Sequence, residues 1–312
     1  MAEVVACLTR GQVIVLQAGE ARHELHSPYA DELMPRTPPV SAPFVDVSRG
    51  RRSDELCYAV SSGGLSSVFT QIPGSGEERR LFAANAEIKD LDFSFADEAL
   101  ACTVVDKTGT SAIGLLRDDG KGMRTVTEGD VLDREPRWAP GGRGEIVYAS
   151  AGIGRTKSGV RVGLSPFALH RLSLADSTVE VLVSDAKYDY LAPVPVSQSL
   201  IYAIRRAHQG PLRKSPLGVI AGGLLAPFRK SGSKPMAAVQ SDAASANEGH
   251  ELVRITERRM EAVAQGVLAF DVTVAGVIVY SNGSGVFRLS AESPSTPEKI
   301  TDLASVEQLV IC

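Results

Sequence analysis

One strand-like pattern recurs along the chain and limits the fold more than any other feature. Each copy has two or three apolar residues, then a Tyr or a Cys, then small or polar residues. Such runs form β-strands, because β-branched and aromatic side chains pack well on a pleated surface. Spacings from 44 residues (Tyr58 to Cys102) to 78 residues (Tyr202 to Tyr280) predict a repeat architecture. The residues in register are Cys7, Tyr58, Cys102, Tyr148, Tyr202 and Tyr280.

The clearest copy lies in residues 133–150, DREPRWAPGGRGEIVYAS. Pro140 and Gly141 suit a tight turn, since Pro presets φ at the first turn position and Gly accepts a positive φ. Trp138 is the only Trp in the chain, and a large ring just before a turn predicts packing against a neighbouring sheet. Two strands alone are marginal in water, so the hairpin requires partner strands.

This stretch resembles the inner hairpin of a TolB-like β-propeller blade, whose pattern is D-x-x-P-x-W-S-P-D-G followed by an I-x-Y-x-S strand. The resemblance is strong at 133–150, moderate at 88–105 and 187–206 and weak elsewhere, and it covers nearly the whole chain. It implies an all-β fold, a six-bladed propeller of four-stranded blades with WD40-like, PD40-type repeats. A β-sandwich would explain the strands but not their recurring register.

The two ends of the chain are expected to share one blade. Only three strands occur at the N-terminus, and VEQLVIC (306–312) supplies a strand after the last blade. Pairing of this last strand with the first blade would close the ring and remove an exposed sheet edge.

Composition indicates a single domain in a reducing compartment. A chain of 312 residues permits two domains, but all-β folds of this size are often single, so one propeller over 1–312 is expected. The N-terminus lacks the pattern of a secretory signal, and no run approaches the roughly 18 apolar residues of a spanning helix. The four Cys form no C-x-x-C pair, which is typical of reduced thiols in a cytoplasmic protein. The formal net charge of −4 argues against nucleic acid as a partner.

Three segments lie outside the repeat: 27–42 between the first two blades, an insertion at 151–166 in the fourth blade and an insertion at 205–250 in the fifth. In an up-and-down blade, the loops between second and third strands leave from the same face as the connections between blades. We therefore expect all three segments on one rim, where loops on a rigid scaffold often carry function. On the smaller insertion, Lys157 and Arg161 are candidate partner-binding residues.

The larger insertion differs in charge from the rest of the chain. Residues 205–240 hold seven Lys and Arg and no acidic residue, and the remainder has a formal charge of −11. Such asymmetry favours an acidic partner or an anionic surface. A short amphipathic helix is predicted after Ser215, with Pro216 at its first position. The candidate partner-binding residues are Arg213, Lys214, Leu217, Ile220, Leu224, Leu225, Phe228, Arg229 and Lys230.

Three interpretations of this insertion stay open. It packs on the propeller's own rim with solvated basic flanks, it docks a partner protein, or it lies on an anionic membrane surface. The predicted helix contains three Gly, which cost about 1 kcal/mol each relative to Ala, so it requires a docking surface. Its polar face is uncharged, which is unusual for a helix at a membrane interface.

Catalytic motifs are missing from the sequence. No H-E-x-x-H, G-x-S-x-G, Walker A or G-x-G-x-x-G pattern occurs. His208 and His250 flank the larger insertion and are expected to be exposed. Arg49 belongs to a basic turn, SRGRRSDE, that is expected to be solvated.

The inner strands offer carboxylates that could face a central channel, where some propeller hydrolases bind calcium. By that resemblance the metal candidates are Asp46, Asp92, Asp189 and Asp271, with Glu135 in the same set. Alternatively, these residues belong to the blade pattern itself and accept backbone hydrogen bonds.

The sequence as a whole favours a non-enzymatic scaffold that presents one rim to a protein partner and uses no cofactor. Its alternatives are a metal-dependent hydrolase or lyase using channel carboxylates, and a peripheral membrane adaptor acting through residues 205–240.

Overall fold

The chain was analysed as a computed structural model that describes residues 4–17, 20–27, 44–52, 54–62, 64–75, 77–117, 122–141, 144–209, 249–290 and 293–312. All regular structure in these ranges is β, as predicted, and no helix long and apolar enough to cross a membrane occurs there. The helix expected after Ser215 lies outside the described residues.

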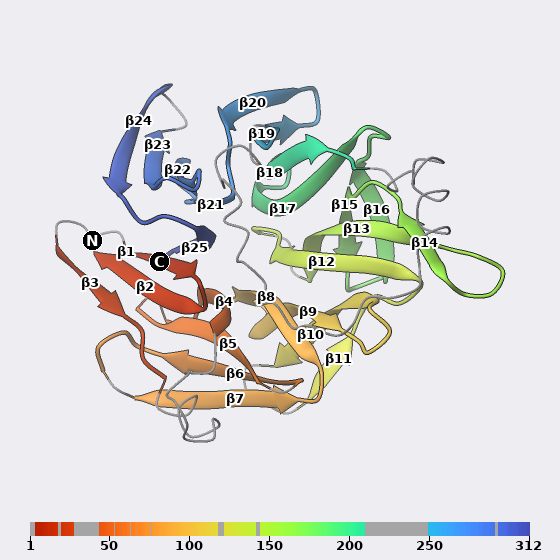
Figure 1. Ribbon diagram of the computed structural model, residues 1–312, viewed down its shortest axis with the longest axis horizontal. Coiled ribbons are helices and arrows are strands. Elements are labelled where there is room, and N and C mark those ends of the chain that lie inside the picture. The colour runs from red at the N-terminus through yellow and green to blue at the C-terminus, as the bar shows by residue number, and fades with distance from the viewer. Residues whose placement is uncertain are drawn as a thin grey trace, which may run out of the picture.

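The strands form small antiparallel sheets arranged around a centre (Figure 1). One four-stranded sheet has the order β25–β1–β2–β3 and another the order β4–β5–β6–β7; two more are β17–β18–β19–β20 and β21–β22–β23–β24. A nine-stranded sheet contains β8–β11 and β12–β16, and a single parallel pair of residues, Ser111 opposite Leu132, joins these two groups into one sheet. The last strand, β25, pairs with β1 and places Leu309 opposite Cys7.

The strands of the first half of the chain are β1 (Val4–Thr9), β2 (Gln12–Gln17), β3 (Glu20–Glu24), β4 (Phe44–Arg49), β5 (Leu56–Ser62), β6 (Leu65–Gln71), β7 (Glu78–Ala84), β8 (Glu87–Ser94), β9 (Ala99–Val105), β10 (Ser111–Arg117), β11 (Met123–Thr125) and β12 (Val131–Trp138). Those of the second half are β13 (Glu145–Arg155), β14 (Arg161–Leu164), β15 (Ala168–Ser173), β16 (Thr178–Val183), β17 (Tyr188–Ser197), β18 (Leu200–Ala207), β19 (Glu251–Thr256), β20 (Met260–Gln265), β21 (Ala269–Val272), β22 (Val277–Ser281), β23 (Val286–Ser290), β24 (Ser293–Thr301) and β25 (Val306–Ile311).

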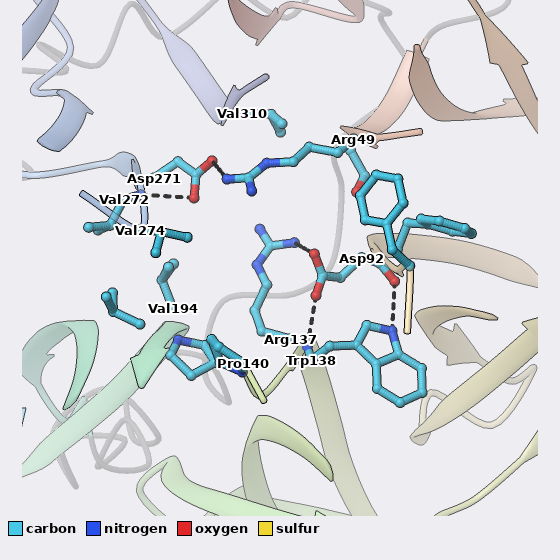
Figure 2. Close-up of a pocket in the computed structure, with 15 residues that line it drawn as sticks. Arg49, Asp92, Arg137, Trp138, Pro140, Val194, Asp271, Val272, Val274 and Val310 are labelled. Atoms are coloured by element: carbon cyan, nitrogen blue, oxygen red, sulfur yellow. Dashed lines mark hydrogen bonds and ion pairs between the residues drawn. The ribbon is translucent and has the colours of Figure 1, made fainter. Parts of the chain in front are cut away.

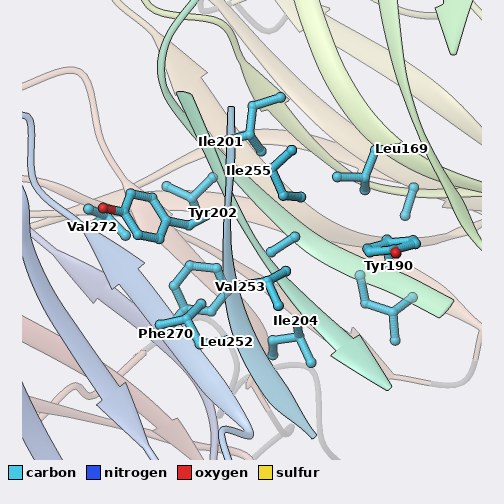
Figure 3. Close-up of a cluster of buried hydrophobic side chains, with 14 of the residues drawn as sticks. Leu169, Tyr190, Ile201, Tyr202, Ile204, Leu252, Val253, Ile255, Phe270 and Val272 are labelled. Carbon is cyan, nitrogen blue, oxygen red and sulfur yellow. The ribbon is translucent and has the colours of Figure 1, made fainter. Parts of the chain in front are cut away.

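The predicted register is confirmed. Each of its six residues lies on the second strand from the centre (β1, β5, β9, β13, β18 or β22), and each is buried. Their neighbours pack between adjacent sheets. In Figure 3, Leu169 and Tyr190 lie on one side of β18 while Phe270 and Val272 approach Tyr202 from β21. Burial of this apolar surface, at about 25 cal/mol per Å², is the main force that holds neighbouring sheets together.

The strands nearest the centre are β25, β4, β8, β12, β17 and β21, and we call them the inner strands (Figure 1). Five of them have a bulge or register shift, and on β8, β12 and β17 it includes a residue of positive φ: Asp90 (φ 55°), Glu135 (φ 56°) and Ala192 (φ 48°). A bulge releases residues from the ladder, which explains how β12 and β17 accept Pro136 and Pro193 within the strand.

The insertion predicted at 151–166 is a hairpin and not an open loop. Strand β13 runs past its sheet to Arg155, and β14 pairs back onto it. The turn is closed by Thr156 and by Gly159 at φ 84°, and the Val160 N–H donates to Thr156 Oγ1 (3.1 Å). Figure 1 shows this β13–β14 hairpin extending outward from the body of the molecule.

Candidate functional site

A central cavity of about 170 Å³ is lined by the same position of every inner strand. Each inner strand contributes one residue at this position. Its partner on the second strand is the residue immediately before the Tyr or Cys of the repeat. The pairs are Ser48 with Cys57, Asp92 with Ala101, Arg137 with Val147, Pro195 with Ile201, Asp271 with Val279 and Val310 with Ala6. The repeat therefore builds one layer of side chains around the cavity, which we call the channel pocket.

The channel pocket has a charged side and an apolar side (Figure 2). Arg49, Asp92, Arg137 and Asp271 make the charged side. The apolar side consists of Val194, Pro195, Val196, Val272 and Val274.

Arg49 and Asp271 form the first ion pair. Arg49 Nη2 lies 3.0 Å from Asp271 Oδ2, which also accepts the Ile311 N–H at 2.8 Å. Burial disfavours the charge of Arg49, but Asp271 outweighs this and raises the pKa of the guanidinium above its ordinary value. Arg49 is therefore charged; it ends strand β4 and pairs with Asp271 in the pocket, although its sequence context predicted a turn residue.

Asp92 and Arg137 form the second pair. Asp92 Oδ2 accepts the Trp138 N–H (2.7 Å), and its Oδ1 lies 3.6 Å from Arg137 Nη1. Arg137 Nη1 also donates to the Leu91 carbonyl (2.9 Å). Burial raises the pKa of Asp92, although Arg137 and the Trp138 N–H oppose that rise. Trp138 is buried, as predicted, and its indole Nε1 donates to the Asp92 carbonyl (3.1 Å).

Five inner-strand acids share a common bond: each accepts a backbone N–H from the next inner strand. Such a bond is worth about 1.5–3 kcal/mol when the carboxylate is ionised and about 0.5–1.5 kcal/mol when it is neutral. Asp90 also uses its carboxylate in this way, toward the bulged Glu135 N–H (3.2 Å). The remaining bonds run from Leu91 N to Asp46 (2.9 Å), from Trp138 N to Asp92 (2.7 Å), from Ala192 N to Glu135 (2.5 Å) and from Ile311 N to Asp271 (2.8 Å). At Leu91, Glu135 and Ala192 these bonds hold the N–H groups that the bulges remove from the ladders.

Asp189 lies at the other end of its strand, away from the channel pocket. It accepts the Phe167 N–H (3.0 Å), and it pairs with Arg206 (3.2 Å) and with Nδ1 of His208 (2.8 Å). His208 is largely buried by this contact, so the expectation that it is exposed was wrong.

A second candidate surface lies on the β13–β14 hairpin and on β16. Val160 and Val162 of the hairpin are 60% and 55% exposed, and Val179 and Val181 of β16 are 52% and 55% exposed. Lys157 and Arg161 are exposed on the same hairpin. Exposed apolar residues that gather in one region mark interaction surfaces, whereas scattered ones do not.

Comparison with known proteins supports the fold at low sequence identity. No protein-family model and no curated protein matches the chain. The TolB structure of Acinetobacter baumannii aligns over 99% of this chain and 66% of its own, with 11% identity and a TM-score of 0.60. The chain has the fold of a TolB-like β-propeller.

Two other solved structures share the propeller's overall arrangement. A nidogen/laminin complex aligns over 99% of this chain and 98% of its own (8% identity, TM-score 0.59). A puromycin-hydrolysing peptidase of Mycobacterium tuberculosis aligns over 96% of this chain and 51% of its own (15% identity, TM-score 0.56). The chain spans about two thirds of the TolB structure and about half of the peptidase, so these likenesses concern the fold.

The metal candidates of the propeller do not converge. Asp92 and Asp271 share the channel pocket, whereas Asp46 lies between β4 and β8 and Asp189 at the far end of β17. Within the described ranges, no group of three or more His, Cys, Asp or Glu could hold a metal ion. Calcium requires six to eight oxygen ligands, and the oxygens of these acids already accept N–H groups or pair with Arg. The predicted alternative, acids that accept backbone hydrogen bonds, is confirmed at Asp46, Asp92, Asp189, Asp271 and Glu135.

Sequence reasoning missed Arg49 and Arg137 as pocket residues. A signal was present for Arg137, because it occupies the repeat position that Asp92 and Asp271 occupy in other inner strands. Opposite charges at equivalent repeat positions indicate ion pairs across a channel. Of the predicted partner-binding residues, Lys157 and Arg161 lie on the hairpin, and the nine from Arg213 to Lys230 lie outside the described residues.

Proposed function

We propose that this TolB-like propeller is a non-enzymatic scaffold that presents the β13–β14 hairpin and β16 to a protein partner. The observation that carries the proposal is the pair of exposed Val side chains on the hairpin, Val160 and Val162, beside the exposed Lys157 and Arg161, with Val179 and Val181 exposed on β16 of the same sheet. The propeller body positions them rigidly, and their exposed apolar area is favourable only when a partner covers it.

The two elements suit an extended partner segment. Strand β16 is the outermost strand of its sheet, and within the described residues β14 pairs with β13 alone. A free strand edge offers unpaired N–H and C=O groups to an added strand. Lys157 and Arg161 would favour acidic residues in that segment, and the basic insertion at 205–240 is predicted to extend the same preference.

We infer six blades in the scaffold, with the nine-stranded sheet counted as two. The inner strands contact one another in the order β25, β4, β8, β12, β17, β21 and back to β25, an arrangement that supports a closed ring. The cytoplasm is the proposed location, since Cys7, Cys57 and Cys102 are buried free thiols that suit a reducing compartment.

Affinity purification of tagged protein from its native host tests the proposal. The double variant Val160→Ser, Val162→Ser and the charge variant Lys157→Glu, Arg161→Glu are expected to lose a protein that co-purifies with wild type. Leu65→Ser is the matched control, because Leu65 is equally exposed at 50% on β6, away from this surface. Deletion of 213–234 tests the insertion separately. Retention of the same partners by both hairpin variants, with the fold intact, would overturn the proposal.

A further inference from the structure

We propose that the channel pocket binds the C-terminal carboxylate of a peptide that ends in an apolar residue. This site is separate from the partner-binding surface proposed above. The pocket is formed where the inner strands end and turn outward, whereas the β13–β14 hairpin leaves from the opposite end of β13.

Each guanidinium group of the pocket is held by an ion pair and has further N–H donors that the described residues do not accept. Arg49 is held through Nη2 by Asp271, and Arg137 through Nη1 by Asp92 and the Leu91 carbonyl. A guanidinium has five N–H donors in a fixed plane, and the other donors of both groups have no acceptor among the described residues. Figure 2 shows the two guanidinium groups next to one another in the pocket, with Arg49 of β4 directed to Asp271 and Arg137 of β12 directed to Asp92.

Both acids act on both guanidinium groups: Asp92 raises the pKa of Arg49, and Asp271 raises the pKa of Arg137. Both Arg side chains are therefore charged, and the two guanidinium groups lie next to one another with unused donors (Figure 2). A carboxylate placed between them would accept charge-assisted bonds from both, the geometry for which Arg is best suited.

The rest of the pocket selects the residue that carries the carboxylate. Val194, Pro195 and Val272 line the wall opposite the charged groups. At the mouth, Phe95 is 58% and Val274 85% exposed. A ligand with a carboxylate next to an apolar side chain would therefore satisfy both sides of the pocket.

The size of the pocket limits the part of a ligand that can enter it. Its volume of about 170 Å³ is below the ~300–1,000 Å³ of typical small-molecule sites, so it accommodates one small group, such as the last residue of a peptide. A peptide whose last residue occupies the pocket would extend outward past the exposed Phe95 and Val274.

Trp138 fluorescence gives a direct assay, because it is the only Trp of the chain. Intact protein is titrated with an acetylated pentapeptide ending in Val, with its C-terminal amide, and with isovalerate as the small acid. The expected result is saturable binding of the free-acid peptide. The affinity of the amide is expected to be at least roughly ten-fold lower, because its terminus lacks the charge that strengthens bonds to Arg. Isovalerate is expected to bind more weakly than the peptide.

Variants then test the role of Arg49. Arg49→Gln is expected to weaken the free-acid peptide roughly ten-fold and to abolish the difference between acid and amide. Arg49→Lys keeps the charge beside Asp271 and covers the case in which the Gln variant does not fold. Arg52→Gln is the control, because this substitution changes the net charge by the same amount. Arg52 lies on the following turn and pairs with Asp54 outside the pocket. Equal affinity for acid and amide, equal effects of Arg49→Gln and Arg52→Gln, or tighter binding of isovalerate than of the peptide would each overturn the proposal.

Discussion

Asp46 shows how burial and hydrogen bonding compete at one carboxyl group of the inner strands. It accepts the Leu91 N–H at 2.9 Å and a bond from Gln308 Nε2 at 2.6 Å, and both favour its ionised form. Burial, followed by the charge of Asp90, acts in the opposite direction and raises the pKa of Asp46 to about 8. The same residue therefore joins β4 to β8 and makes that junction sensitive to pH.

The sign of this dependence follows from the two pKa values. An unfolded Asp titrates near ~3.9, so at intermediate pH the folded chain holds a proton that the unfolded chain releases. The contribution of Asp46 to stability is full below about pH 4 and declines as pH rises toward about 8. We expect the free energy of unfolding, measured by urea titration, to fall across this range more steeply for wild type than for Asp46→Asn. Parallel pH profiles for the two proteins would contradict this assignment.

At the scale of a single element, the local sequence of the β13–β14 hairpin does not determine its structure. Gly152, Gly154 and Gly163 weaken its strand propensity, and the sequence therefore predicted an enlarged loop. In the structure the hairpin depends on distant contacts, since Arg155 Nε donates to both carboxylate oxygens of Asp130 (2.8 and 2.6 Å) and the Ile153 N–H donates to the Asp130 carbonyl (2.9 Å). The other strands were predictable because their apolar residues alternate and recur.

Loss of Arg155 is expected to loosen this hairpin and little else. Arg155→Ala removes the bonds to Asp130 and a bond to the Gly159 carbonyl (3.2 Å). Both charges lie near solvent, so global stability is expected to change little. Hydrogen–deuterium exchange measured by mass spectrometry should show faster exchange in peptides covering 153–164 and unchanged exchange in β8 and β9. Exchange that quickens equally throughout the chain would show that the hairpin is not an independent element.

At the scale of the whole molecule, the register of the second strands could be predicted from the sequence. The partners of the charged side chains on the inner strands could not. The register position is buried in each copy of the pattern, as at Tyr58 and Tyr148. Arg49 pairs with Asp271, on a strand 222 positions later in the chain, and that neighbour exists only once β4 and β21 face the same centre. The acids were correctly placed on inner strands, whereas the choice between metal binding and backbone bonding depended on which N–H groups lay nearby.

The central claim is that five inner-strand acids join neighbouring strands by accepting backbone N–H groups. Asp271 offers the most direct test, since it binds the Ile311 N–H of β25 and Arg49 of β4. The measurement is equilibrium unfolding in urea of wild type and Asp271→Ala, each with excess calcium and with a chelator. The account predicts a loss of roughly 1–3 kcal/mol in Asp271→Ala from the unpaired buried N–H, and the same stability for wild type with and without calcium. Calcium that stabilises wild type but not Asp271→Ala would contradict the claim.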